Sequence, residues 1–392
     1  MRRFLYITSR ALFIYGGRLL YALHKPKLQS IDSPQSILLI RWDRIGDAVV
    51  TLPIIGMLKR AFPKACIDVV ASAHNSFVFD NNSDINTVIV LDGFGRDYGV
   101  VTRIKSLLTS RFTRFKNPAF DKKYDVCIDM TNGEKTLIFK AFAECFIGPK
   151  SDDGLSLMYD FYPNQSLIES ELTYVQYYQY FFNAFFDKQF NYIASPAPVK
   201  KCDSSFFTSK RKKVIIYIGG SQDYRRLSIE DSQEIINALS QKYNVYIFDD
   251  PNSDRANKVK VPLQHATFLA GYSLQELSYI ARSCIFYIGA EGGVSHYLSS
   301  HIRSLVVFSP KYYFQHHKIW LPFDGGIYTV RHENRYEKTL TSSGTMGHMA
   351  MLIKPVKIYP MPPYVSEEMI TVPSSVYLEA IINLTKETSH VS

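Results

Sequence analysis

A glycine–aspartate pair stands out among the residues of this chain that could do chemistry. Residues 41–47, Arg-Trp-Asp-Arg-Ile-Gly-Asp, come directly after an apolar run and before a helical pattern. Gly46 would let the backbone approach a ligand closely, and Asp47 would project from the helix N-terminus, where the helix dipole keeps a carboxylate ionised. Such a carboxylate can act as a general base toward a hydroxyl group. The alternative is that Asp47 only caps the helix, which is the commoner use of aspartate there.

A second turn, residues 289–296 with the sequence Gly-Ala-Glu-Gly-Gly-Val-Ser-His, suits a phosphate. Gly292 and Gly293 would free consecutive backbone amides to point at the phosphate, and Ser295 and His296 could add side-chain donors. The turn matches neither G-x-G-x-x-G nor the Walker pattern, which disfavours ordinary dinucleotide and P-loop sites. The alternative is a tight turn that needs glycine for its geometry.

A third turn, residues 219–226, places Arg225 and Arg226 after a glycine pair. Guanidinium groups bind phosphate bidentately, so two adjacent arginines suit a diphosphate. The alternative is ordinary solvated surface charge.

All three turns fall where a predicted strand is followed by a helix, which indicates an alternating β/α chain. Continuous apolar runs are typical of strands buried on both faces of a parallel sheet. In the first half we predict strands at 36–41, 67–71, 87–91 and 126–130, a helix through 55–62 whose first turns Pro53 should kink, and helices after Gly133 and at 172–186. In the second half we predict strands at 214–218, 245–248, 267–269, 284–288 and 304–309, and helices at 229–239, 274–281 and 295–300.

The alternation restarts after Ser-Pro-Ala-Pro at 195–198, which is typical of a linker. Two consecutive β/α units predict an α/β protein of two Rossmann-like domains that face each other across a cleft, with ligands at the carboxyl ends of the strands. We expect a segment at 1–31, an N-terminal domain at 32–195 and a C-terminal domain at 196–392. The terminal helix at 375–385 is a candidate to pack back on the N-terminal domain.

Composition and charge limit the classes of partner. The 392 residues carry a formal net charge of +9, which favours polyanions: nucleic acid, an anionic membrane surface or phosphorylated small molecules. The absence of zinc-finger spacing and of an RNP-like motif argues against nucleic acid. The 5 cysteines show no C-x-x-C, which favours reduced thiols in a cytosolic compartment over a disulfide frame or a metal site. The 26 Phe and 27 Tyr indicate an aromatic-rich core or a surface that meets amphipathic material.

The first 31 residues contain basic and apolar residues but no acidic ones. Arg10 and Arg18 break every apolar run well short of the roughly 20 residues of a membrane span. A cationic amphipathic helix on an anionic leaflet fits this pattern, as does a helix that docks on its own domain. The first of these would make the protein peripheral on the inner face of the cytoplasmic membrane.

Taken together, the motifs resemble those of the lipopolysaccharide heptosyltransferase family, glycosyltransferase family nine. Ile-Arg-Trp-Asp-Arg-Ile-Gly-Asp-Ala-Val-Val-Thr-Leu-Pro at 40–53 is similar to the family's opening motif. The later pieces follow in the family's order: Tyr-Asp-Val-Cys-Ile-Asp at 124–129, the Arg225-Arg226 segment, Gly-Tyr-Ser-Leu-Gln-Glu-Leu at 271–277, and the turn at 289–296. The resemblance covers about residues 36 to 310 and the terminal helix.

The resemblance implies the two-domain architecture called GT-B and an inverting transfer that needs neither metal nor cofactor. The donor would be an ADP-activated heptose and the acceptor a lipopolysaccharide core sugar or related glycan. Asp47 matches the catalytic base, with Arg44 and Gly46 in the same acceptor-side turn. The matching donor-side residues are Ser221, Arg225, Arg226, Tyr272, Glu291, Gly292, Gly293, Val294 and His296.

Departures from the family pattern leave the substrates open. Family members usually have Asp in place of Glu291 and Ser or Thr in place of Gly292. A ribose-binding acidic residue aligns with Asn252, with Asp249, Asp250 and Asp254 close by. Residues 149–171 and 331–373 match nothing in the family. The alternatives are another nucleotide sugar, a protein or capsule acceptor, a GT-B-fold sugar-nucleotide epimerase, and a non-catalytic protein that binds glycolipid.

Overall fold

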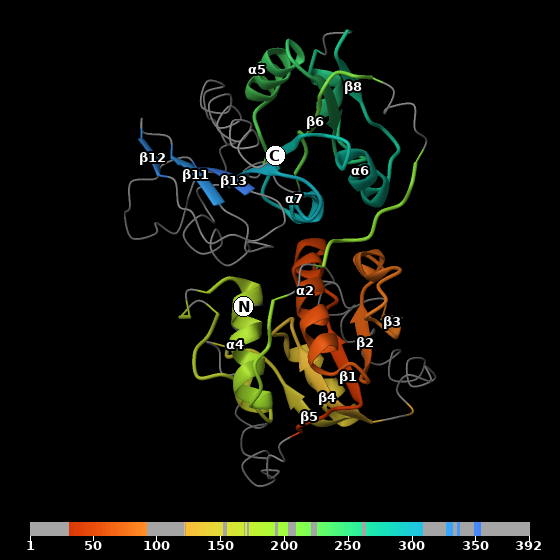
Figure 1. Cartoon of the computed structure of the whole chain (residues 1–392), viewed down its shortest axis with the longest axis vertical. Helices are drawn as coiled ribbons and strands as arrows, with labels where there is room; N and C mark the ends of the chain where they lie inside the picture. Colours follow the sequence, from red (N-terminus) through yellow and green to blue (C-terminus); the bar gives the residue numbers. More distant parts are fainter. Residues whose placement is uncertain are drawn as a thin grey trace, which may run out of the picture. The chain divides into compact units, whose positions relative to one another are not determined.

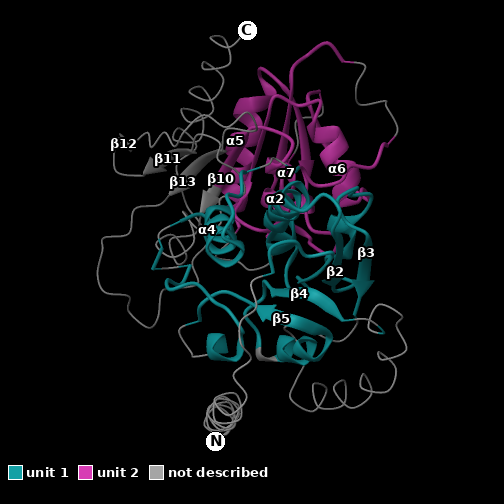
Figure 2. Ribbon diagram, turned by 60° about the horizontal axis from the view of Figure 1, so that its bottom comes forward, with its two compact units in different colours: residues 1–195 teal, residues 196–392 magenta. Residues whose placement is uncertain are grey.

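The chain divides into two compact units, unit 1 at residues 1–195 and unit 2 at residues 196–392 (Figure 2). The predicted N-terminal segment, apart from Ile31, and the predicted terminal helix lie outside the described residues. The computed structural model describes residues 31–91, 121, 123–151, 155–167, 169–170, 172–192, 195–202, 209–220, 226–260 and 264–308, with the strand backbones at 327–331, 335–337 and 349–353.

Unit 1 is built on a five-stranded parallel sheet of order β3-β2-β1-β4-β5 (Figure 1). The central strand, β1 (Ser36–Ile40), is apolar along its length, and residues 37–40 are fully buried. The four strands predicted for this half are confirmed to within two residues at each end. A fifth strand, β5, was not predicted. The other strands are β2 (Cys66–Ala71), β3 (Thr87–Val90), β4 (Tyr124–Asp129) and β5 (Ala143–Ile147).

Two α-helices of unit 1 pack against each other beside the sheet (Figure 1). Helix α2 (Ile45–Ala61) continues through Pro53 and buries most of its residues. Helix α4 (Tyr174–Phe186) confirms the predicted aromatic helix and begins after a capping box formed by Thr173 and Gln176. The helix predicted after Gly133 is a 3₁₀ helix, η4 (Glu134–Phe142). Two short 3₁₀ helices complete the described part of the unit, η1 (Ser76–Phe79) and η5 (Leu155–Met158).

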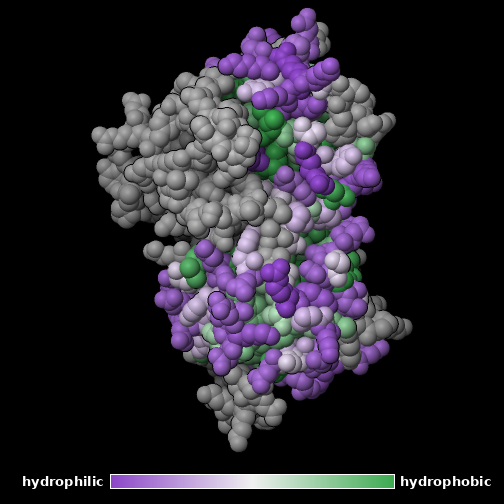
Figure 3. Space-filling model, in the orientation of Figure 1, coloured by the Kyte–Doolittle hydropathy of each residue, from purple (hydrophilic) through white to green (hydrophobic). Residues whose placement is uncertain are grey.

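The aromatic residues of unit 1 belong largely to its core. Eight residues of α4 are buried, and the Phe62 and Phe186 rings meet with centroids 4.8 Å apart. Among the described residues, Val90 and Tyr180 are the exposed large hydrophobic side chains. On the face that Figure 3 shows, hydrophilic residues cover much of the described surface of unit 1. None of the described helices combines the length and the apolar character needed to cross a membrane.

Unit 2 contains an eight-stranded sheet of order β12-β11-β13-β10-β9-β6-β7-β8. The strands pair in parallel except β11 with β12, which are antiparallel. The strands are β6 (Lys213–Tyr217), β7 (Asn244–Phe248), β8 (Ala266–Phe268), β9 (Phe286–Ala290), β10 (Ser304–Phe308), β11 (Ile327–Arg331), β12 (Arg335–Glu337) and β13 (Met349–Ile353). The α/β prediction, with one mostly parallel sheet in each half, is confirmed.

The helices of unit 2 begin at polar caps or glycine. Ser228 accepts a hydrogen bond from the Asp231 amide at the start of α5 (Ile229–Ser240), and Ser273 forms a capping box with Glu276 at the start of α6 (Leu274–Ala281). Helix α7 (Gly293–Ser299) follows Gly292. The described helices also include the 3₁₀ helix η8 (Arg255–Lys258).

Two features of unit 2 differ in detail from the sequence prediction. Strand β9 begins two residues later than the predicted 284, because the amides of Ser283 and Cys284 still bond back to the end of α6. The region after residue 326, where no strand was predicted, contributes β11, β12 and β13. Strand β13 lies between β10 and β11, a pairing that no local pattern reveals.

Candidate active site

The first candidate turn lies at the carboxyl end of the central strand of unit 1. The Arg41 amide donates to the Val70 carbonyl of β2 (2.8 Å), and the Met130 amide after β4 donates to the Ile40 carbonyl (3.2 Å). Strand β1 lies between β2 and β4, where the order of the strands reverses direction. In open α/β sheets, ligands bind at such switch points, beyond the carboxyl ends of the strands.

Asp47 is the third residue of α2, within its first turn and half-buried. The N-cap position is taken by Arg44, which is exposed and whose side chain makes no capping hydrogen bond. Asp47 is therefore not the N-cap residue, and the macrodipole of a 17-residue helix favours its negative charge. Gly46 is buried in the same turn.

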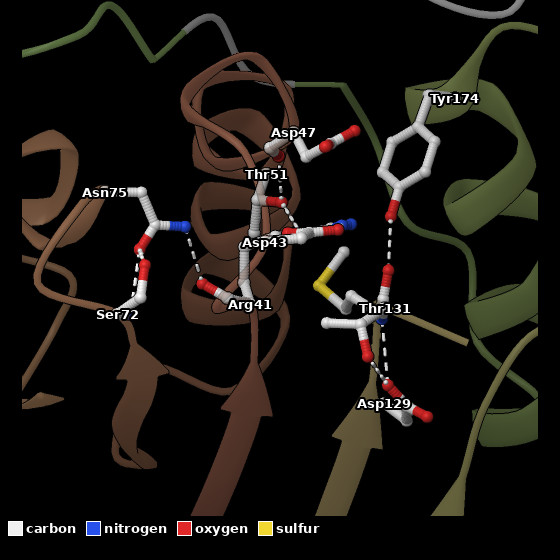
Figure 4. A network of polar contacts seen from close by, with 10 residues as sticks. Arg41, Asp43, Asp47, Thr51, Ser72, Asn75, Asp129, Thr131 and Tyr174 are labelled. Atoms are coloured by element: carbon white, nitrogen blue, oxygen red, sulfur yellow. Dashed lines mark hydrogen bonds and ion pairs between the residues drawn. The ribbon is translucent and has the colours of Figure 1, made fainter. Parts of the chain in front are cut away.

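A polar network links this turn to the segment that follows β2 (Figure 4). Asn75 donates to the Arg41 carbonyl (3.0 Å) and accepts from both the backbone and the hydroxyl of Ser72 (2.9 and 3.0 Å). Figure 4 shows Asp47 extending from α2 toward the side of Tyr174, with Ser72 and Asn75 on the other side of Arg41. The turn that carries Asp47 is thus held by side chains that follow β2 and by the start of α2.

Asp129, at the end of β4, is a buried carboxylate beside this turn. It accepts hydrogen bonds from the Thr131 amide (2.8 Å), the Thr131 hydroxyl (2.9 Å), the Tyr159 hydroxyl (2.7 Å) and the Thr136 hydroxyl. Burial raises the pKa of Asp129, and these four hydrogen bonds counteract the rise. Because its oxygens are occupied by these donors, Asp129 holds the β4–η4 turn and is poorly placed for proton transfer.

The two candidate turns of unit 2 and the turn that carries Tyr272 share one edge of its sheet. Strands β9, β6, β7 and β8 are consecutive neighbours and run parallel, so the residues that follow them emerge at the same edge. The turn after β9 carries residues 291–296, the turn after β6 carries residues 219–226, and the turn after β8 carries Gly271 and Tyr272. The structure therefore brings the predicted donor-side segments together, except for residues 221–225, which include Ser221 and Arg225 and lie outside the described part of the chain.

The β9–α7 turn combines open backbone with a buried histidine. His296 is 5% exposed, and its Nε2 lies 3.6 Å from Glu291 Oε1, while its Nδ1 has no hydrogen-bond partner among the described residues. Gly292 is extended (φ 161°), a conformation open to any residue, and a Cβ there would meet nothing within 4 Å. Turn geometry therefore does not explain Gly292. Gly293 and Val294 form the first turn of α7 and are half-buried.

The β6–α5 turn is held by Asp250. Its carboxylate accepts from the Tyr217 hydroxyl (2.6 Å) and from the Gly220 amide (2.9 Å). Arg226 Nε donates to the Gly220 carbonyl (2.7 Å), so this arginine also fixes the turn. Asp249 likewise accepts from backbone amides, and Asp254 pairs with Lys258 at 2.7 Å. The acidic side chains near Asn252 are thus engaged by the protein itself.

Tyr272 stands in the turn between β8 and α6. Gly271 before it has φ +80°, a left-handed conformation that favours glycine, and Ser273 after it begins the capping box of α6. Tyr272 is half-buried against the apolar cluster beneath α6.

The residues that sequence reasoning missed are those that support Asp47: Arg41, Asp43 and Thr51. Arg41 could have been found from the sequence, because it is a charged residue placed between a predicted buried strand and a predicted helix.

Comparisons with known proteins identify the fold. No family model and no curated protein matches the sequence. Among solved structures, a family 9 glycosyl transferase from Veillonella parvula is similar with a TM-score of 0.65 and 14% identity, over 90% of this chain and 98% of that one. The E. coli heptosyltransferase WaaC with ADP is similar with a TM-score of 0.58, again at 14% identity and over 90% and 98% of the two chains. The same enzyme with ADP-2-deoxy-2-fluoro heptose gives a TM-score of 0.57. The chain therefore has the two-domain α/β fold of these glycosyltransferases.

Proposed function

We propose that this chain is an inverting glycosyltransferase that takes a sugar from a nucleotide-sugar donor without a metal ion. The observation that carries the proposal is the place of Asp47, on the first helical turn beyond the central strand of unit 1 and at the switch point of its sheet. The shared fold over 90% of the chain supports the same reading.

Asp47 would remove the proton of an acceptor hydroxyl as that oxygen attacks the anomeric carbon from the face opposite the nucleotide. The new glycosidic bond forms while the bond to the diphosphate breaks, which inverts the anomeric centre. The proton passes to the Asp47 carboxylate, and the electron pair leaves with the diphosphate. General-base assistance of this kind accelerates a reaction by about 10²–10⁴.

Unit 2 would bind the donor. The leaving diphosphate gains negative charge in the transition state, and preorganised donors stabilise such charge. We assign this role to Arg225, to Ser221 and to the backbone amides of residues 291–294. Tyr272 offers a half-buried aromatic ring for the nucleobase, and His296 has a buried nitrogen without a described partner. Arg226 contributes indirectly, through the Gly220 carbonyl.

We further propose an ADP-activated heptose as donor and a lipopolysaccharide core or related glycan as acceptor. The support is the similarity to a heptosyltransferase solved with ADP and with an ADP-heptose analogue.

We also propose that the protein lies on the inner face of the cytoplasmic membrane. Segment 1–31 has six basic residues and no acidic ones, which supports binding to an anionic membrane surface. Deleting 1–31 should then reduce sedimentation with anionic vesicles in a salt-dependent way, with little change in melting temperature. A large drop in melting temperature with unchanged vesicle binding would indicate a helix docked on its own domain.

A panel of nucleotide sugars tests the proposed function. The protein is incubated with each donor, with and without core oligosaccharide, and released nucleoside diphosphate and glycan products are measured by mass spectrometry. We expect ADP-heptose to be consumed, Asp47→Asn to be inactive, and the exposed Asp32→Asn to match the wild type. The proposal would be contradicted if none of the donors released its nucleoside diphosphate. It would also be contradicted if Asp47→Asn transferred sugar at the wild-type rate. A product in which a sugar nucleotide is epimerised would favour the epimerase alternative.

A further inference from the structure

Arg41 is a charged side chain in the core of unit 1. It follows β1 directly and is 1% exposed, although arginine is almost never fully buried unless it is paired. Its Nη1 donates to Asp43 Oδ2 at 2.9 Å and its Nε donates to the Thr51 hydroxyl at 2.9 Å. Its Nη2 is buried and has no hydrogen-bond partner among the described residues. Burying a guanidinium is costly, so its retention here calls for a role beyond packing.

The second bond of Arg41 leads to Asp47. The Thr51 hydroxyl, which accepts from Arg41 Nε, donates its own proton to the Asp47 carbonyl at 2.8 Å. The guanidinium, the hydroxyl and the Asp47 backbone therefore form one chain across the first turn of α2 (Figure 4). Since Arg41 orients the lone pairs of Thr51, it also directs the Thr51 proton toward the turn that carries Asp47.

Arg41 and the Asp47 carboxylate also attract each other through space. Burial by itself lowers the pKa of Arg41, but the nearby carboxylates of Asp43 and Asp47, together with Tyr178 and the hydrogen bond to Asp43, raise it overall. The attraction between two charges is mutual, so a permanently charged guanidinium favours the ionised form of Asp47.

The groups that face Arg41 from other elements leave this attraction in place. From α4, the Tyr174 ring lies 5.2 Å from the guanidinium carbon. The Tyr178 hydroxyl is buried without a described hydrogen-bond partner, and burial keeps the pKa of Tyr178 well above its usual value, so it is neutral. From β4, Asp129 is engaged by four hydrogen-bond donors. Arg44, the next cation along the chain, is exposed to solvent.

We propose that Arg41 is the positioning residue of Asp47: its buried guanidinium fixes the first turn of α2 through Thr51 and holds a permanent positive charge beside that turn. The catalytic consequence rests on the proposed function, whereas the coupling between the two side chains does not. Asp43 completes the arrangement by holding the guanidinium from the other side.

A carboxyl ¹³C NMR titration tests the coupling without any substrate. The Asp47 signal is assigned by its loss in Asp47→Asn and followed with pH in the wild type, Arg41→Met and Arg41→Lys. We expect the midpoint to move to higher pH by about one unit in Arg41→Met, because a nearby positive charge is removed, and to move less in Arg41→Lys. Arg41→Gln removes the charge but keeps a donor for Thr51, and it replaces the methionine variant if that one does not fold. Arg60→Met, on the exposed last turn of the same helix, should leave the midpoint unchanged. An unchanged midpoint in a folded variant without the Arg41 charge would overturn the inference.

Transfer kinetics then separate this inference from the proposed function. With an active donor, Arg41→Met should lower kcat at least tenfold and move the acid limb of the kcat profile to higher pH, with nucleotide affinity unchanged. Thr51→Val should lower kcat, and Thr51→Ser, which restores the hydroxyl, should recover it. If Asp47→Asn abolishes transfer while Arg41→Met changes neither kcat nor its pH profile, the inference fails and the function stands. If no donor is used but the Asp47 midpoint still moves, the function fails and the coupling stands.

Discussion

The candidate turn of unit 1 and those of unit 2 are built in opposite ways. The turn after β1 is held by side chains: Arg41, Thr51 and Asn75 hold the backbone around one half-buried carboxylate. The turn after β9 offers backbone, since Gly292 leaves open space where a side chain would stand. A side-chain network of this kind suits one proton transfer in a fixed geometry, whereas open amides suit an anionic ligand that arrives and leaves. The contrast predicts that substitutions in unit 1 change the rate of the chemical step, while those in unit 2 change donor affinity.

The largest expected effect is that of Asp47→Ala on kcat. A general base acts in the transition state and barely in ground-state binding, so kcat should fall by about 10²–10⁴ while nucleotide affinity stays within a few-fold. In unit 2, His296→Ala should do the reverse and weaken nucleotide binding more than it lowers kcat at saturation. Initial rates and nucleotide titration by calorimetry measure both quantities. Near-normal turnover in Asp47→Ala would remove the contrast between the two units.

Acid should act on the two units in opposite directions. In unit 2, burial lowers the pKa of His301 to about 4, with a further contribution from Arg282. The unfolded chain protonates this histidine below about pH 6.5 and the folded chain does not until about pH 4, so stability falls across that window by up to about 3 kcal/mol. In unit 1, burial raises the pKa of Asp129, so protonation as pH falls through that raised value favours the folded state.

Urea denaturation at pH 7 and pH 5 measures this acid sensitivity. His301→Gln should lose less stability between the two pH values than the wild type does. His265→Gln, at a half-buried histidine of the same unit, serves as the matched control and should lose as much as the wild type. Equal acid sensitivity in all three proteins would show that His301 is not the source.

A pair of glycines in unit 2 separates stability from binding. A Cβ on Gly289 would lie 1.9 Å from the Tyr287 hydroxyl, so Gly289→Ala should destabilise the protein by about 1–3 kcal/mol. A Cβ on Gly292 would meet nothing, so Gly292→Ala should leave the melting temperature unchanged and weaken nucleotide binding by about tenfold, which is about 1.4 kcal/mol. Thermal unfolding and nucleotide titration of both variants decide the matter. Unchanged binding in Gly292→Ala would mean that no ligand group approaches this turn.

The sequence predicted those parts of the molecule that depend on neighbours along the chain. The apolar run of β1 and the helical pattern of α6 are local, and so is the placement of Asp47 just beyond a buried strand. Strand β13 was missed because its place between β10 and β11 depends on partners that are distant along the chain.

The supporting residues of the site were missed for a related reason. The motif contains Arg41, but its burial depends on α4, which lies more than 130 residues later. The role of Asp250 depends on contacts with Tyr217 and Gly220 on a neighbouring strand. A motif identifies a residue that can act, while the groups that orient it come from whatever the fold packs against it.

The smallest expected effect on kcat is that of removing metal ions. The proposed donor site supplies positive charge from Arg225 and from backbone amides, which can stabilise a leaving diphosphate as a cation would. Within the described ranges, no three His, Cys, Asp or Glu side chains are arranged to hold a metal. We therefore expect transfer to continue unchanged in excess EDTA, and added Mg²⁺ or Mn²⁺ to have no effect on kcat. A strict metal requirement would mean that a bound ion, and not the backbone amides and Arg225, supplies the positive charge. The contrast between the two units would then fail, because unit 2 would also depend on a side-chain ligand set.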